Sequence, residues 1–161
     1  MHSDYFLRMI ERFSQILASI IRARKEENYP NALQQIQTNC QIFLNEDISL
    51  FLKYQPKELV DHFKNGQLFD SEKAIICADL IYELALICQE QQSDDASLQL
   101  KEKALNLYCV AIPHEKTIQH VDYVKKASAL IIEMQDKIHS MEFQANLLHF
   151  QGFMNKAKAK V

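Results

Sequence analysis

Two carboxylates interrupt the most apolar stretch of this chain, and a pair of acids is a common source of acid–base chemistry. Asp79 and Glu83 lie four residues apart in AIICADLIYELALIC, residues 74–88, so both fall on one side of a predicted helix. If that side is buried, each carboxylate must be paired or protonated, and Arg8 or Arg12 is a candidate partner. The favoured interpretation is that this side faces solvent.

The cysteines are the second group of residues with possible chemistry. A nucleophilic cysteine needs a partner histidine and an electropositive setting, yet Cys88 and Cys109 both lie in apolar helical runs. The four cysteines form no CxxC pair and are widely spaced, at Cys40, Cys77, Cys88 and Cys109. We therefore predict reduced thiols in the core of a cytoplasmic protein.

Other catalytic and ligand-binding motifs do not occur. With 2 glycines the chain has no GxGxxG or Walker sequence that would cradle a phosphate, and it has no GxSxG elbow. Its 6 histidines show no HExxH spacing and do not combine with cysteine at zinc-site intervals. We expect no catalytic residue, no cofactor and no metal, and hence a protein that is not an enzyme.

Charged residues also follow the first predicted helix. Tyr5, Arg8, Glu11 and Arg12 lie between its apolar positions, where they would form an exposed docking strip or a structural ion pair that fixes the helix on the domain. The ion pair is the favoured alternative. A membrane-surface helix usually carries Lys and Arg along its whole polar face, so we expect no membrane binding.

The composition favours one all-α domain over residues 1–161. Sheets joined by many turns consume glycine and proline, and this chain has 2 Gly and 3 Pro. A net charge of -3 gives no electrostatic footprint for nucleic acid. No apolar run reaches the ~18 residues of a membrane span, and the N-terminus does not resemble a signal peptide.

Apolar periodicity and capping residues place the expected helices. The first begins at Ser3 or Asp4, the second at Pro30, and a third runs from Pro56 to a C-terminal Gly66. The apolar stretch 74–88 belongs to a central helix that begins at Asp70 or Ser71. Three more follow, with starts near 94–95, 115 and 140, the first of them ending before Pro113. We expect at least about 70% helix and no sheet.

A tetratricopeptide-like spacing occurs in the second half of the chain. One unit has the large and small positions of that repeat at Ile81, Leu84, Ala85 and Cys88, and then small residues at Ser97 and Ala104. A weaker unit begins at Met141 and has Gly152 at the position of the turn. The fold expected is a right-handed stack of antiparallel helix pairs; an irregular helical bundle is the alternative.

The first helix also resembles the opening of a family of small bacterial proteins with no assigned function. In that family the helix has the form D-Y-x-x-R-x-I-E, which is matched here by Asp4, Tyr5, Arg8, Ile10 and Glu11. GFMNKA, residues 152–157, is similar to the family's G-x-F-x-K-A turn, although the residues before it are shortened. The resemblance implies a tetratricopeptide-like fold and no particular activity.

These features lead to a functional hypothesis by analogy with other helical stacks. We expect a non-catalytic cytoplasmic module that binds a protein or peptide, with candidate interaction residues Tyr5, Arg8, Glu11, Arg12, Asp79 and Glu83. The alternative is a small-ligand protein or enzyme with a pocket between helices near Asp79, Tyr82 and Glu83.

The C-terminal residues suggest self-association. If the chain stops soon after a turn at Gly152, the last helix pair lacks most of its second helix. Its apolar residues would then be poorly covered: Leu147, Leu148, Phe150, Phe153 and Met154. Either this segment folds back onto the domain, or it forms a homodimer through residues 140–161, which is slightly favoured.

Overall fold

The computed structural model describes residues 2–114, 120–137 and 140–159, and within them the fold is all-α. The described residues form eight helices and one hairpin of two very short strands. In chain order these elements are α1 (His2–Lys25), α2 (Tyr29–Leu44), α3 (Ile48–Lys53), α4 (Pro56–His62), β1 (Lys64–Asn65), β2 (Leu68–Phe69), α5 (Ser71–Glu90), α6 (Asp94–His114), α7 (His120–Met134) and α8 (Met141–Ala159).

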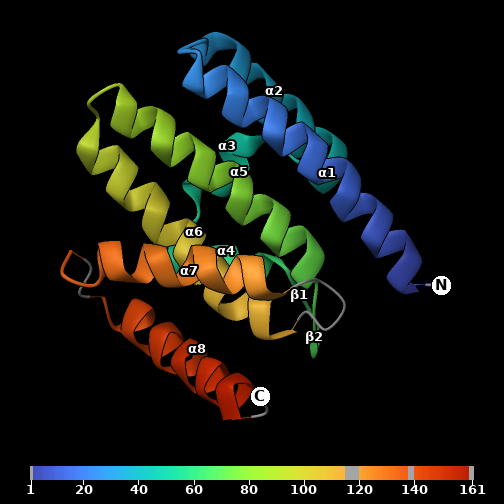
Figure 1. The fold of residues 1–161 in the computed structure, drawn as a ribbon, viewed down its shortest axis with the longest axis vertical. Coiled ribbons are helices and arrows are strands. Elements are labelled where there is room, and N and C mark those ends of the chain that lie inside the picture. Colours follow the sequence, from blue (N-terminus) through green and yellow to red (C-terminus); the bar gives the residue numbers. More distant parts are fainter. Residues whose placement is uncertain (1, 115–119, 138–139, 160–161) are drawn as a thin grey trace.

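Helices α5 and α6 form the centre of the molecule. They pack against each other more extensively than any other pair of elements and are joined by a short turn at residues 91–93. Helices α1 and α2 lie together against α5 at one end, whereas α7 and α8 pack on α6 (Figure 1). The short helix α4 also packs on α6.

Local capping explains where several helices begin. The Asp70 side chain accepts a hydrogen bond from the Lys73 backbone N–H at 3.2 Å, which confirms the predicted start of α5. Asn28 caps α2 ahead of Pro30, and Pro56 occupies the first turn of α4. In both first turns the missing proline N–H has no helical partner to lose.

Helix α5 is the most enclosed element. Leu80, Ile81 and Ala85 are completely buried, and 13 of its residues are buried in all, as expected for a helix that is apolar nearly all round. No helix within the described ranges combines the length and the apolarity needed to cross a bilayer.

The predicted role of Gly66 as the end of a helix is wrong. Helix α4 ends at His62, and Gly66 (φ 66°) lies in the tight turn between β1 and β2. These strands pair antiparallel, with Asn65 opposite Leu68. A positive φ at the first turn residue matches the twist of a two-residue hairpin, so glycine is required for a different reason. The prediction of no sheet therefore fails at these four residues.

Two other predicted breaks are also wrong. Helix α6 continues through Pro113 to His114, because a proline in the last turn interrupts only one backbone hydrogen bond. Gly152 lies inside α8, so the second proposed repeat unit and its G-x-F-x-K-A turn do not form. The predicted start near residue 115 lies outside the described residues.

The C-terminal segment folds back onto the domain. Phe143, Leu147 and Phe150 on α8 are buried, and α8 packs along α6. Phe153 and Met154 are partly buried, and of the five residues expected to be poorly covered only Leu148 is strongly exposed, at 69%. Within the described residues most of the segment is thus covered by its own domain. Among these five residues Leu148 is left as the exposed apolar position for a homodimer, which stays a prediction.

Candidate functional site

Asp79 is fully buried and is bonded on both carboxylate oxygens. Its Oδ1 accepts hydrogen bonds from the Tyr108 hydroxyl on α6 and from Lys126 Nζ on α7, the latter at 2.8 Å. Its Oδ2 accepts from the Tyr123 hydroxyl at 3.1 Å. A buried carboxylate is tolerated where a counter-charge and donors replace its lost hydration. Asp79 therefore links three helices.

Aromatic rings surround the cation of this network. Lys126 Nζ lies 5.0 Å from the ring centre of Tyr82 and 5.4 Å from that of Tyr108. Both distances are within the range of cation–π attraction. Because the Lys126 side chain is 29% exposed, the ion pair lies at the edge of the core.

The tyrosines of the network act as donors. Burial, and then the neighbouring charge of Asp79, raises the pKa of Tyr108 well above its usual value. The same two causes, in the same order, raise the pKa of Tyr123. Both hydroxyls are thus protonated at neutral pH, and neither is suited to be a base.

Glu83 is held by a separate partner on α1. Arg24 Nε lies 3.0 Å from Glu83 Oε1, and Arg24 Nη1 lies 2.7 Å from Glu90 Oε2. Burial raises the pKa of Glu83, an effect that the Arg24 hydrogen bond and charge oppose. One guanidinium therefore connects the end of α1 to two turns of α5.

The prediction that Asp79 and Glu83 face solvent is wrong, since both are buried. The structure gives Lys126 and Arg24 as their partners, in place of the expected Arg8 or Arg12. The partners are 47 and 59 residues away along the chain. The sequence indicated that these two carboxylates need partners, because a charge within an apolar helix must be paired. It did not identify the partner residues.

All four residues of the predicted N-terminal docking strip belong to α1. Arg8, Glu11 and Arg12 are exposed, and the Arg12 guanidinium lies 5.7 Å from the ring centre of Phe43 on α2. Tyr5 belongs to α1, but its side chain is outside the part of the chain that the structure describes. The structure does not bring this strip to Asp79 and Glu83.

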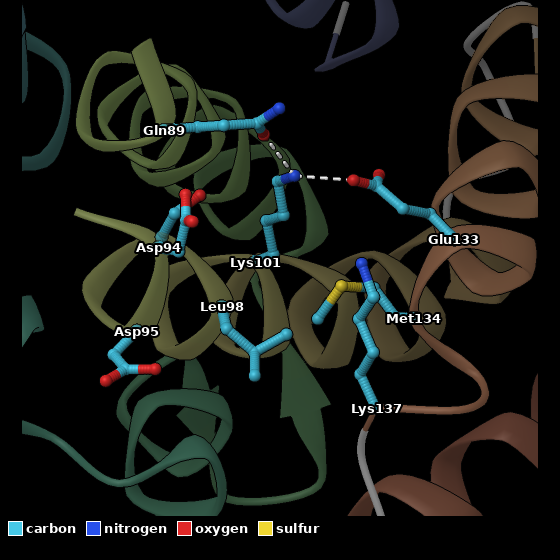
Figure 2. Close-up of a pocket in the computed structure, with 9 residues that line it drawn as sticks. Gln89, Asp94, Asp95, Leu98, Lys101, Glu133, Met134 and Lys137 are labelled. Atoms are coloured by element: carbon cyan, nitrogen blue, oxygen red, sulfur yellow. Dashed lines mark hydrogen bonds and ion pairs between the residues drawn. The ribbon is translucent and has the colours of Figure 1, made fainter. Parts of the chain in front are cut away.

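A pocket of about 350 Å³ lies where the end of α5 meets the first turns of α6 and the end of α7 (Figure 2). The lining of this pocket does not include Asp79, Tyr82 or Glu83. Its lining combines charged, polar and apolar side chains: Gln89, Asp94, Asp95, Ser97, Leu98, Lys101, Glu133, Met134 and Lys137. No sequence motif indicated this site, because its residues come from three helices and the turn after α7.

Lys101 is the buried charged residue of this pocket lining, whereas the other charged residues of the lining are exposed. Its Nζ donates to Gln89 Oε1 and to Glu133 Oε1, both at 2.6 Å, and its side chain is 7% exposed. Figure 2 shows the ammonium between these two acceptors, with Leu98 and Met134 below it in this view. A single buried cation thus joins α5, α6 and α7.

In the described ranges the cysteines are not placed for nucleophilic chemistry, and no side chains are grouped as metal ligands. All four cysteines are free, and Cys40, Cys77 and Cys109 are buried. Burial raises the pKa of the Cys40 and Cys109 thiols to about 12, which opposes thiolate formation. Cys88 departs from the predicted core position, because it is half-buried. Over the same ranges no three His, Cys, Asp or Glu side chains are grouped so that they could hold a metal ion.

No protein-family model matches the chain, and neither the curated proteins nor the solved structures include a significant match. The resemblance of the first helix to a bacterial family stays a prediction.

Proposed function

We propose that this chain is a non-catalytic cytoplasmic module that binds a protein or peptide partner. The observation that carries the proposal is the pocket at the junction of α5, α6 and α7, whose mixed lining suits a peptide. The buried carboxylates support the non-catalytic part of the proposal, since Asp79 and Glu83 are both engaged in ion pairs within the chain.

We also propose that α5 and α6 form an antiparallel pair of the tetratricopeptide type. Ser97 Oγ donates to the Ala85 backbone carbonyl at 2.7 Å, and Ala104 is completely buried. Small residues at these positions support a close crossing of the two helices, as the repeat spacing of the sequence predicts. Such stacks present binding surfaces along one face.

A small-ligand site near Asp79, Tyr82 and Glu83 is the weaker alternative. Tyr108, Tyr123 and Lys126 fill the space around Asp79 with their own side chains, and Arg24 covers Glu83. The pocket at Lys101 gives the alternative a different location, but its position at the surface suits a segment of a larger partner.

Selection from a displayed library of random peptides tests the proposal. We expect a recurrent peptide motif that binds the purified chain in solution, measured by fluorescence anisotropy. Repeated selections that give no peptide with saturable binding would contradict the function proposed here.

Neighbouring substitutions then locate the binding surface. Leu98→Arg places a charge in the pocket and should abolish binding of the selected peptide. Gln99→Arg, at the adjacent exposed position of α6, adds the same side chain outside the pocket and should leave affinity unchanged. Arg12→Glu tests the α1 strip, and loss of binding in this variant alone would assign the partner to that surface.

A further inference from the structure

The buried cation of the pocket has unused donor capacity. An ammonium group carries three protons, and Lys101 gives two of them to Gln89 and Glu133 within the described residues. Its side chain is more than nine-tenths buried, so the third direction is poorly served by bulk water. An oxygen acceptor on a ligand in the pocket would complete this coordination.

An acceptor lies beside this donor. Only Oε1 of Glu133 is used by Lys101, and the Glu133 side chain is 39% exposed, so Oε2 is available to a ligand N–H. The Lys101–Glu133 pair therefore presents one donor and one acceptor. An extended backbone residue, whose own N–H and C=O point to the same side, has the complementary pair.

The pocket carries charges of both signs in nearly equal number. Three carboxylates (Asp94, Asp95 and Glu133) accompany two lysines (Lys101 and Lys137), and one of each is already paired. A polyanion would meet more acidic than basic groups, whereas a polycation would meet two ammonium groups. A ligand that is neutral overall but strongly polar suits this balance.

We propose that this pocket binds one residue of an extended peptide through its backbone. The peptide C=O accepts a hydrogen bond from Lys101, the N–H donates to Glu133, and an apolar side chain packs on Leu98 and Met134. This inference rests on the proposed function and specifies how that function recognises its ligand.

A matched pair of small compounds tests the inference. N-acetyl-leucine N-methylamide contains a complete backbone residue, and the ester 2-acetoxy-4-methylpentanoic acid N-methylamide differs by replacing the N–H of that residue with oxygen. We expect the amide to shift the NMR signals of Leu98, Lys101 and Met134 in the full chain. The ester should bind about tenfold more weakly, because Glu133 is then left without its donor.

Glu133→Gln is the decisive variant. It replaces the free oxygen with an NH₂ group, so the preference for amide over ester should disappear. Asp136→Asn, at an exposed position just beyond α7 and outside the pocket lining, should retain the preference. Lys101→Met should weaken both compounds, with circular dichroism as the check on folding; if this variant unfolds, Glu133→Gln decides.

The outcomes separate this inference from the proposed function. Equal binding of amide and ester, shifts outside the pocket, or an unchanged preference in Glu133→Gln would each overturn the backbone recognition. Absence of binding by both compounds would overturn it too. In every one of these cases a selected peptide that still binds the chain would leave the proposed function standing.

Discussion

The Asp79 carboxylate shows how much one residue depends on distant parts of the chain. Its three donors come from α6 and α7, and each replaces a hydrogen bond that water would otherwise supply. Removal of one member of a buried ion pair commonly costs about 3–5 kcal/mol, because the other charge is left unpaired. Here the partial exposure of Lys126 reduces that penalty.

Asp79→Asn should therefore lower the free energy of unfolding by about 2–4 kcal/mol, as measured by urea denaturation. Asp136→Asn removes the same charge at an exposed site and should change stability by no more than ~0.5 kcal/mol. Equal stability of the two variants would mean that the Asp79 network contributes nothing to folding.

The cysteines offer a second test at this scale. Cys88 is half-buried and should react first with a thiol reagent in the native protein, and Cys88→Ser should remove that fast reaction. Cys40 and Cys109 should react only on unfolding, because burial raises the pKa of both thiols to about 12. Fast labelling of native Cys109 would instead support a nucleophilic role.

The sequence predicted which residues are unusual but not what surrounds them. Asp79 and Glu83 were recognisable as charges within an apolar helix, yet α5 is apolar on nearly every side. The pattern therefore did not distinguish a buried side from an exposed one. Lys101 was not recognisable at all, because its site forms only when Gln89 and Glu133 approach from α5 and α7.

At the scale of the elements, prediction succeeded where a local interaction determines the outcome. Asp70 caps α5 through its own side chain, so the sequence alone was sufficient. Glycine positions predicted the element boundaries less well, because a glycine can occupy a helix end, a hairpin turn or a helix interior. Gly66 lies in the hairpin, and Gly152 lies within α8, where a glycine costs about 1 kcal/mol relative to alanine.

The contact between α5 and α6 gives the prediction for this scale. Ala104 is completely buried, and Ala104→Leu should overpack the interior and lower the free energy of unfolding by about 1–3 kcal/mol. Ala96→Leu adds the same volume at an exposed position of α6 and should be nearly neutral. Thermal denaturation of both variants provides the comparison, and a neutral Ala104→Leu would show that the interior of α6 is not tightly packed.

At the scale of the whole molecule, the exposed apolar residues of α8 are where we expect self-association. The homodimer through residues 140–161 stays a prediction. Among the described residues of this segment, the large apolar side chains that are strongly exposed are Met141 and Leu148, at 88% and 69%. Deletion of the segment is an unsuitable test, because Phe143 and Phe150 would be lost from the core.

Light scattering coupled to size exclusion should give a dimer mass for the natural sequence and a monomer mass for Leu148→Glu. Gln151→Glu, at another exposed position of α8, adds the same charge and should retain the dimer. A monomer mass for the natural sequence would reject self-association, and a dimeric Leu148→Glu would assign it to another surface.

The arrangement of the helices connects the fold to the proposed function. The pocket exists because α5, α6 and α7 meet at Lys101, so its recognition properties depend on the packing of all three helices. A crystal structure of the chain with a selected peptide tests this claim most directly. We predict a peptide residue between α6 and α7 in contact with Leu98, Lys101 and Glu133; a peptide seated on the α1 strip, with this pocket empty, would contradict it.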